Sequence, residues 1–293
     1  MRILLTGASS FTGYWFAKKL AEAGHEVHAP LRRSQEEYMG SRAERLINSC
    51  ELSYNTLFGS SRFLDLIRAE GPFDLLCHHA AEVKDYRSPT FDVQAAVAAN
   101  THQLPRALEL LGDAHVVLTG TIFEPDITAY GRSKGLTTQI FREQCPSLSH
   151  FVIPNPFGPF EEPRFSAYLV REWAAGRTAQ VKTPAYIRDN IHVSLLADAY
   201  VNHVEKPAPT DLSPSGYVES IGEFTARYSR EMRARLGWEC SFTCADQTDF
   251  PEPLRRTGIH SVHCTSAQEQ QCWDEIADLA LLLKKQIRRH RVR

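Results

Sequence analysis

The stretch LTGASSFTG, residues 5–13, decides the fold that we expect for this chain. It joins residues 2–6, an apolar segment that predicts a buried strand, to residues 13–23, which predict a helix. Gly7 and Gly13 let the backbone turn sharply and come close to a ligand. The amides at the start of a helix, together with the positive end of its dipole, receive phosphate oxygens. The spacing therefore predicts a strand–turn–helix unit that holds the pyrophosphate of a dinucleotide.

The centre of this turn departs from the usual glycine spacing, because Ser10 stands at the middle position between Gly7 and Gly13. A serine adds little volume, and its hydroxyl is able to bond a phosphate oxygen. Phe11 and Thr12 come next, and we expect Thr12 to cap the helix. We assign these five residues to the cofactor. An ordinary strand-to-helix loop without a ligand is the alternative.

Predicted strands and helices alternate over the first half of the chain, which is typical of a parallel sheet built from βαβ units. We expect an α/β fold with a doubly wound parallel sheet of the Rossmann type over residues 1–155. Beyond that point the alternation stops, and residues 156–293 predict a smaller, mainly substrate-binding lobe, with segments that return to the sheet. The expected strands are 2–6, 26–31, 50–56, 73–78, 115–119 and 151–153, and the expected helices are 13–23, 36–48, 61–70, 91–111, 128–144, 163–175, 192–205, 221–236 and 273–290.

Composition excludes several classes of function. The net charge of −2 gives no general reason to bind nucleic acid, and the basic C-terminus, residues 284–293, is typical of a solvated helix end. No apolar run approaches the roughly 18 residues that span a bilayer, and the first residues lack a signal-peptide pattern. We therefore expect neither a nucleic-acid nor a membrane partner.

The seven cysteines are scattered and odd in number, which favours reduced thiols in the cytoplasm over a disulfide framework. Cys240 and Cys244, together with His260 and His263, invite a comparison with zinc sites. Their spacings fall outside those of the common zinc fingers, so we expect no metal.

The residues after the second predicted strand bear on the choice of dinucleotide. An acidic residue at this point favours a free ribose 2′-hydroxyl, whereas arginine accommodates a 2′-phosphate. The sequence has Arg32 and Arg33 there and no carboxylate. We therefore expect NADP, with NAD as the alternative. The other interpretation is that both arginines only solvate the loop.

A tyrosine and a lysine four residues apart, Tyr130 and Lys134, share one face of the helix predicted over residues 128–144. A nearby ammonium lowers the pKa of a phenol, which then exchanges a proton with an alcohol near neutral pH. The preceding strand ends close to Thr121, whose hydroxyl is placed to bond the same substrate oxygen. Two solvated side chains, and a threonine bonded to local backbone, are the alternatives.

With these parts in place, the chain resembles the extended short-chain dehydrogenase/reductase family, in particular its nucleotide-sugar epimerases, dehydratases and reductases. Gly7, Ser10 and Gly13 are similar to the family's glycine motif, and Thr121, Tyr130 and Lys134 to its catalytic residues. The resemblance implies that His79, Ala80 and Ala81 line the cofactor and that Asn100 lies beside the active site.

The second half carries two further similarities. Residues 154–159 are similar to a family motif in which the asparagine contacts the substrate and the neighbouring backbone contacts the nicotinamide end, which implies roles for Asn155 and Pro154. Residues 188–193 are similar to a motif whose arginine, here Arg188, binds the nucleotide diphosphate. We expect Arg164 or Arg256 to be a further diphosphate ligand.

The choice within the family rests on the residues directly after Thr121. Dehydration needs acid and base groups there, but Ile122 and Phe123 come first and Glu124 stands too late. With the arginines after the second strand, this favours an NADP(H)-dependent reductase of a nucleotide-activated keto-sugar. An epimerase with tightly bound NAD is the alternative, and a dehydratase or a dinucleotide-sensing module without turnover is less favoured. The resemblance also implies a homodimer, for which Ala95, Ala96, Ala98 and Ala99 allow close helix approach.

Overall fold

The computed structural model describes residues 1–46, 50–206 and 211–291. The chain divides into two compact units, which are described separately. The first comprises Met1–Ile153 and Ala197–Ser213, and the second comprises Pro154–Leu196 and Pro214–Arg293. The segment 197–213 therefore belongs with the N-terminal unit, although it lies late in the sequence.

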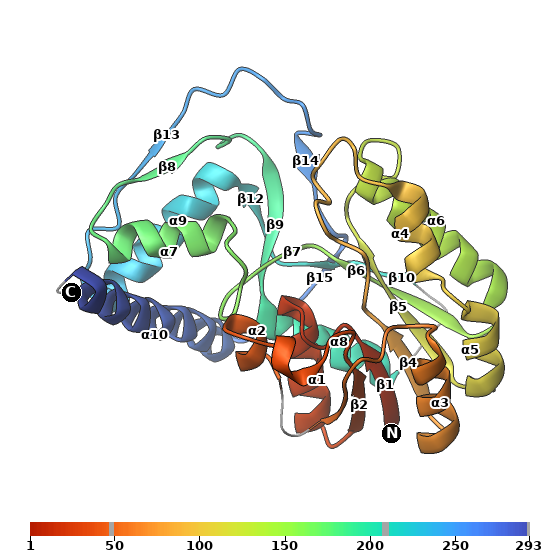
Figure 1. The fold of residues 1–293 in the computed structure, drawn as a ribbon. Helices are drawn as coiled ribbons and strands as arrows, with labels where there is room; N and C mark the ends of the chain where they lie inside the picture. The colour runs from red at the N-terminus through yellow and green to blue at the C-terminus, as the bar shows by residue number, and fades with distance from the viewer. Residues whose placement is uncertain (47–49, 207–210, 292–293) are drawn as a thin grey trace. The chain divides into compact units, whose positions relative to one another are not determined.

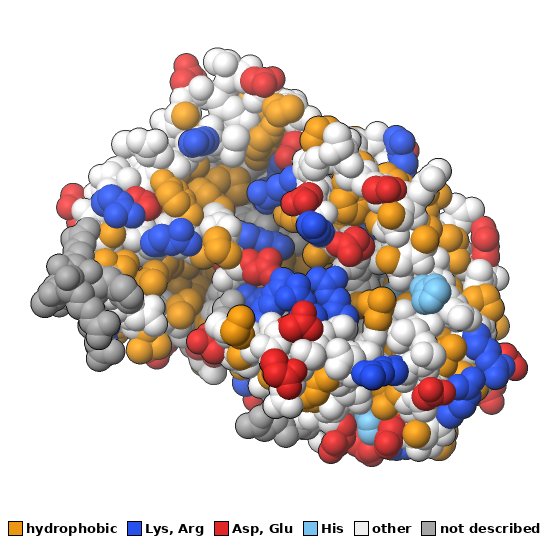
Figure 2. Space-filling view, in the orientation of Figure 1, with side chains coloured by type: hydrophobic (Ala, Val, Ile, Leu, Met, Phe, Trp, Pro, Cys, Tyr) orange, Lys and Arg blue, Asp and Glu red, His pale blue; other side chains and the backbone are white. Residues whose placement is uncertain are grey.

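Basic and acidic side chains lie side by side on the face of the molecule that Figure 2 shows. This mixture agrees with the small net charge of the chain. Among the described residues, none of the helices combines the length and the apolar character that crossing a bilayer requires.

The first unit contains a seven-stranded sheet in which every neighbouring pair of strands is parallel (Figure 1). The strand order is β10-β6-β5-β4-β1-β2-β3, so the order reverses between β1 and β4. Open α/β sheets bind ligands at such a reversal, beyond the carboxyl ends of the strands. The expected doubly wound fold is confirmed. The strands are β1 Arg2–Thr6, β2 Glu26–Pro30, β3 Glu51–Ser53, β4 Leu75–His78, β5 His115–Thr121, β6 Leu148–Ile153 and β10 Asp211–Leu212.

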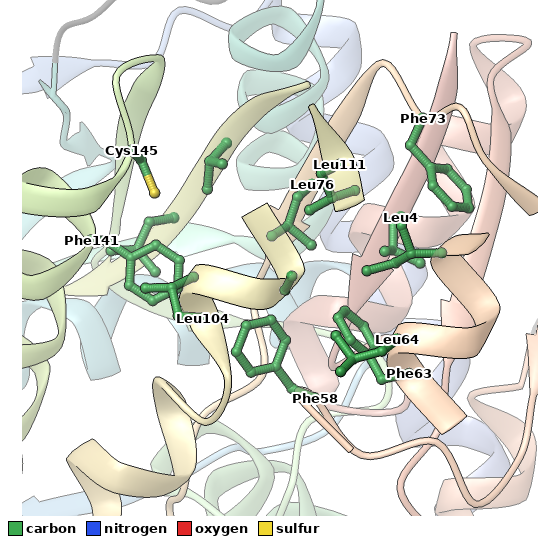
Figure 3. Packing of buried hydrophobic residues seen from close by; sticks show 14 residues of the cluster. Leu4, Phe58, Phe63, Leu64, Phe73, Leu76, Leu104, Leu111, Phe141 and Cys145 are labelled. Atoms are coloured by element: carbon green, nitrogen blue, oxygen red, sulfur yellow. The ribbon is translucent and has the colours of Figure 1, made fainter. Parts of the chain in front are cut away.

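Helices cover both faces of this sheet because the strands are apolar on both sides. On one face, α3 (Ser61–Glu70), α5 (Leu104–Leu111) and α6 (Ala129–Gln144) enclose a cluster that includes Leu4, Leu76 and Phe141 (Figure 3). On the other face, Phe16 of α1 (Phe11–Glu22) stacks on Tyr200 of α8 (Val193–Glu205), with 3.9 Å between ring centroids.

Two expected helices differ from those in the structure. The prediction of one long helix over residues 91–111 is wrong, because the structure has two helices there, α4 (Val93–Asn100) and α5. Gln103 takes a left-handed conformation between them, and Pro105 lies in the first turn of α5. The helix over 36–48 is also shorter than expected. A 3₁₀ turn (Gln35–Glu37) and α2 (Ser41–Glu44) replace it, and residues 47–48 lie outside the described part.

The second unit has a small mixed sheet in which β9 (Ile187–His192) is the central strand. It pairs with β7 (Asn155–Phe157) and β14 (Arg255–Arg256) in parallel, and with β12 (Tyr217–Ser220) in antiparallel orientation. Two short parallel pairs complete the unit, β8 (Ala179–Val181) with β13 (Phe242–Cys244) and β11 (Pro214–Ser215) with β15 (His260–Ser261).

Three helices pack around the core of the second unit: α7 (Phe165–Ala174), α9 (Ile221–Leu236) and α10 (Ser266–Arg291). The core is rich in aromatic rings, among them Phe157, Tyr228 and Trp273, whose centroids lie between 5.2 and 6.0 Å apart. These contacts bring the irregular second half of the chain into one body.

Candidate active site

The turn between β1 and α1 closes so tightly that only glycine fits at two positions. Gly7 has a φ of +77°, and a Cβ atom there would lie 2.8 Å from the backbone nitrogen of Ala80. A Cβ on Gly13 would lie 2.1 Å from the carbonyl oxygen of Gly7. Both contacts are with backbone, which is unable to yield as a flexible side chain does.

Ser10, not Thr12, caps α1, and the helix begins at Phe11, two residues earlier than expected. The backbone of Ser10 is extended, and its hydroxyl oxygen accepts a hydrogen bond from the N–H of Gly13 at 3.1 Å. This geometry explains the serine at the middle glycine position, since it supplies the cap that a glycine lacks. The prediction that Thr12 caps the helix is wrong.

The first turn of α1 has the properties that a pyrophosphate requires. The initial amides of a helix have no partner within the helix, and the dipole places positive charge there. The side chain of Phe11 is buried, so this residue offers its backbone to a ligand and not its ring. The residues present therefore fit the pyrophosphate of a dinucleotide.

His79 links this turn to the neighbouring strands. Its Nε2 atom lies 3.1 Å from the Ser10 hydroxyl and 3.0 Å from the Thr12 hydroxyl, and its Nδ1 atom lies 3.1 Å from the Thr119 hydroxyl. Desolvation, with a smaller contribution from the Lys134 ammonium, lowers the pKa of His79 to about 3. The ring is therefore neutral near pH 7 and has one donor and one acceptor nitrogen.

The neighbouring groups assign the tautomer of His79. The Thr119 hydroxyl donates to the carbonyl oxygen of His78 at 3.3 Å, so toward His79 it acts as acceptor and Nδ1 carries the proton. Nε2 is then the acceptor for Ser10, whose oxygen already accepts from Gly13. One imidazole thus connects the phosphate turn to β5.

Thr6, the last residue of β1, fixes the loop after β4 in the same way. Its hydroxyl oxygen accepts from the backbone N–H groups of His79 at 3.1 Å and Ala80 at 3.0 Å. The same hydroxyl lies 3.1 Å from Nδ1 of His78. Because the Thr6 oxygen already accepts two hydrogen bonds, the hydroxyl donates its proton to this Nδ1. Residues 79–81 are therefore held against Gly7, where the resemblance predicts that they line the cofactor.

Arg32 and Arg33 follow β2 after one intervening residue, Leu31, at the carboxyl edge of the sheet. The side chain of Arg32 is half-exposed, and its guanidinium lies 3.8 Å from the carboxylate of Glu82. Glu82 is in the loop after β4, so the acidic neighbour of Arg32 comes from a distant part of the sequence. Arg32 is open to solvent and retains hydrogen-bonding capacity for an anion.

Thr121 and Lys134, which the sequence predicts as catalytic residues, are both linked to the end of β5. Thr121 is the last residue of this strand, and its oxygen accepts from the N–H of Phe123 at 3.3 Å. The Nζ atom of Lys134 donates to the carbonyl oxygen of Thr119 at 2.7 Å. Since Thr119 and Thr121 are two residues apart on one strand, their side chains share a face of the sheet.

Lys134 is buried, and desolvation lowers its pKa to about 8. A lysine with such a pKa remains largely protonated at pH 7 but exists in both forms close to physiological pH. Its charge acts at short range in a desolvated setting, which strengthens its effect on a nearby phenol.

Tyr130 lies in the first turn of α6, behind the N-cap Thr128. Three aromatic rings pack around it, with centroid distances of 5.2 Å to Tyr86, 6.0 Å to Phe91 and 5.9 Å to Phe123. These contacts hold the Tyr130 ring in an apolar, aromatic environment. Tyr130 and Lys134 remain one helical turn apart, and the pairing of the phenol with the ammonium stays a prediction.

Asn100 is buried at the end of α4, and its contacts show a positioning role. Its side-chain oxygen accepts from the N–H of Glu82 at 2.9 Å, and its amide nitrogen lies 3.5 Å from the hydroxyl of Thr137 on α6. It therefore connects the loop after β4 to the helix that carries Tyr130 and Lys134. A direct contact with the cofactor stays a prediction for this residue.

In the second unit, Arg188 and Arg256 are register partners on β9 and β14. Arg188 donates to one carboxylate oxygen of Glu252 at 3.2 Å, and Arg256 donates to the same oxygen at 3.0 Å. Both guanidiniums are buried, whereas Glu252 is half-exposed. The structure thus brings together two of the three arginines that the sequence analysis names for the diphosphate.

The other predicted residues of this unit have different surroundings. The amide nitrogen of Asn155 donates to the side-chain oxygen of Asn190 at 2.5 Å, across the β7–β9 pairing. Arg164 is exposed at the N-cap of α7, and Pro154 is buried at the start of the unit. Binding of substrate by Asn155 and Arg164, and of the cofactor by Pro154, stays a prediction.

Thr6, Thr119 and Glu252 are among the residues of these networks that escaped the sequence analysis. The two threonines carry a detectable signal, because each is a hydroxyl residue at or near the carboxyl end of an apolar strand. Glu252 carries none, since it lies in an irregular segment whose partners are set by tertiary structure. Among the described residues, no group of histidine, cysteine and acidic side chains is arranged to hold a metal ion.

Comparison with known proteins gives the family of this chain. A family model described as the NAD dependent epimerase/dehydratase family matches residues 3–213. No curated protein matches the chain.

Solved structures share the fold at low sequence identity. UDP-glucose 4-epimerase of Thermotoga maritima, with UDP-glucose, is 16% identical with a TM-score of 0.70, over 95% of this chain and 98% of that chain. The Thermus thermophilus UDP-glucose 4-epimerase, in complex with NAD, is 15% identical with a TM-score of 0.70, over 96% and 99%. The UDP-glucuronic acid 4-epimerase of Bacillus cereus, with UDP-glucuronic acid and NAD, is 14% identical with a TM-score of 0.73, over 97% and 100%.

The lowered pKa of Lys134 predicts a pH-dependent stability. Between pH 8 and the ordinary lysine pKa of 10.5, the unfolded chain keeps a proton that the folded chain has released. The free energy of unfolding of the wild type, relative to Lys134→Met, therefore rises through this window, by on the order of 3 kcal/mol. Urea denaturation of both proteins from about pH 7 to about pH 10.5 measures this difference. Parallel pH profiles would contradict the assignment of a buried, destabilised ammonium.

Proposed function

Since this chain belongs to the NAD dependent epimerase/dehydratase family, we propose that it moves hydride between a nicotinamide dinucleotide and a nucleotide-activated sugar. The main support is a chain of hydrogen bonds from Ser10 through His79 to Thr119. This chain joins the phosphate turn to β5, which contains Thr121 and whose Thr119 carbonyl accepts from Lys134. The proposed cofactor anchor and Lys134 thereby belong to one hydrogen-bonded network at the carboxyl edge of the sheet. Such preorganisation is what catalysis by positioned groups requires.

The roles of the residues derive from their surroundings. A bound nicotinamide supplies or accepts the hydride. Tyr130 delivers the proton to the substrate oxygen, and Thr121 holds that oxygen through its hydroxyl. Lys134, fixed by the Thr119 carbonyl, presents a desolvated positive charge that lowers the pKa of the phenol. Tyr86, Phe91 and Phe123 exclude water from one side of the Tyr130 ring.

We favour reduction of a keto-sugar with NADPH. Arg32 and Arg33 stand where the ribose 2′ position is recognised, and no carboxylate comes directly after Thr121. The loss of acid and base groups at that place speaks against dehydration. In the second unit, Arg188 and Arg256 offer two guanidiniums to the diphosphate of the substrate, with Asn155 and Arg164 as further candidates.

Tyr130→Phe tests the proton-transfer role. We expect kcat for NADPH oxidation with nucleotide keto-sugars to fall by about 10²- to 10⁴-fold, because the variant keeps the ring but loses the proton. Tyr168→Phe is the matched control, since its hydroxyl accepts a local bond from the N–H of Gln180. Wild-type turnover in Tyr130→Phe, measured by NADPH absorbance, would exclude this mechanism. Tight NADPH binding without turnover in the wild type would instead favour a dinucleotide-sensing module.

An epimerase that retains NAD is the second candidate function, and it is favoured by the epimerase structures that share this fold. The absorbance spectrum and the cofactor content of the purified protein separate the two functions. A reductase exchanges its cofactor in each turnover, so we expect little bound dinucleotide. Stoichiometric co-purified NAD would establish the epimerase instead.

The preference for NADP is tested by the double variant Arg32→Ser, Arg33→Ser. We expect kcat/KM for NADPH to fall by about ten-fold or more, with little change for NADH, because only the 2′-phosphate loses charge-assisted hydrogen bonds. Steady-state kinetics with both cofactors measure this. A wild-type preference for NADH would show that the arginines only solvate the loop.

We also propose a homodimer that pairs α4 and α6 with their copies. Ala95, Ala98 and Ala99 are exposed on α4, as close helix packing requires, whereas Ala96 is buried within the subunit. Ala98→Glu places a charge on this surface, so we expect sedimentation to show a monomer for the variant and a dimer for the wild type. A monomeric wild type would contradict the proposal.

A further inference from the structure

The arginine pair of the second unit is covered by one of the chain's own carboxylates. Glu252 uses a single oxygen for both guanidiniums, at 3.2 Å from Arg188 and 3.0 Å from Arg256. The arginine side chains are 10% and 4% exposed, but that of Glu252 is 47% exposed. The carboxylate therefore lies on the solvent side of two buried cations, where an anion from solution has to arrive.

The position of Arg188 does not depend on Glu252 alone. A second nitrogen of Arg188 donates to the carbonyl oxygens of Ile187, Pro253 and Leu254 at 2.8 to 3.3 Å. Its guanidinium also lies over the ring of Tyr186, 4.6 Å from the centroid. This cage of carbonyls and an aromatic face keeps Arg188 in place when the carboxylate leaves.

Glu252 is a limited partner for two arginines. A single carboxylate oxygen serves a donor from each guanidinium, and arginine keeps its charge even when it is buried. A diphosphate has two negative charges and several acceptor oxygens. It therefore matches the pair of guanidiniums better than the one carboxylate does.

We propose that Glu252 is an internal competitor for the diphosphate of the substrate: its carboxylate occupies Arg188 and Arg256 in the ligand-free protein and swings into solvent when the diphosphate binds. This inference rests on the proposed function for the chemical class of the ligand. It makes Glu252 a residue that sets affinity, because each binding event includes the cost of breaking its two ion pairs. The same contact favours release of the nucleotide after turnover.

Glu252→Gln tests the proposal, because the amide keeps the shape of the side chain but removes its charge. The probes are inorganic pyrophosphate, UDP, GDP, CDP and dTDP, titrated by calorimetry into the whole protein. We expect Kd for pyrophosphate and for the preferred nucleotide to fall by about five-fold, the effect of removing the two ion pairs of one half-exposed carboxylate. Affinity for NADPH should stay unchanged. Asp249→Asn, which makes the same change of charge on the same segment, is the matched control.

Glu252→Asp provides a second variant if the glutamine protein folds poorly. It keeps the charge on a shorter side chain that reaches the arginines less well, so its affinity should fall between those of the other two proteins. Unchanged or weaker binding by Glu252→Gln would overturn the proposal and make Glu252 a structural clamp for the arginines. An equal gain in Asp249→Asn would also overturn it, since the effect would then be general electrostatics.

This experiment is independent of turnover. Tighter diphosphate binding by Glu252→Gln, in a protein that fails to oxidise NADPH, would support the competitor and refute the reductase. Failure of the wild type and of Glu252→Gln to bind any of the five probes would refute the competitor, whereas the Tyr130→Phe comparison would still test the hydride chemistry.

Discussion

The backbone contact between Gly7 and Ala80 is the constraint on which the site depends. With a Cβ at Gly7 the nitrogen of Ala80 would be only 2.8 Å away, so the end of β1 and the loop after β4 approach as closely as backbone atoms allow. Thr6 maintains this approach by accepting the N–H groups of His79 and Ala80. The strand order reverses between these two strands, which is where the fold opens toward a ligand.

That close approach places His79 between the phosphate turn and β5. A neutral imidazole serves this position well, because its two nitrogens differ in role and each finds hydroxyl partners, at distances of 3.0 to 3.1 Å. A charged ring would lose the acceptor that Ser10 and Thr12 use. The low pKa of His79 is thus a condition for the network and not a sign of acid–base work.

The two units divide the chemistry that we propose. In this proposal the first unit holds the cofactor, and its buried Lys134 donates to the Thr119 carbonyl on β5, the strand that ends at Thr121. The second unit offers a pair of buried guanidiniums on adjacent strands. In this proposal the binding of a coenzyme is separate from the binding of a substrate, and the second task is assigned to the more irregular part of the chain.

The alternation of strands and helices, and the places of Gly7, Gly13, Thr121, Tyr130 and Lys134 within it, could be predicted from the sequence, because each rests on local spacing and hydrophobic period. The helix break at Gln103 and the cap at Ser10 were missed. Both depend on backbone angles, left-handed at Gln103 and extended at Ser10, that the hydrophobic period does not reveal.

Some interactions were decided by the tertiary structure alone. The bond from Lys134 to Thr119 and the three hydroxyls around His79 join residues that are 15 to 69 positions apart. The carboxylate of Glu252, which binds two arginines, lies in a segment without periodicity. The sequence by itself determined the class of fold and the types of residue at its sheet edge. Strand order and packing set which of those side chains contact one another, because a hydrogen bond between distant residues produces no regular spacing in the sequence.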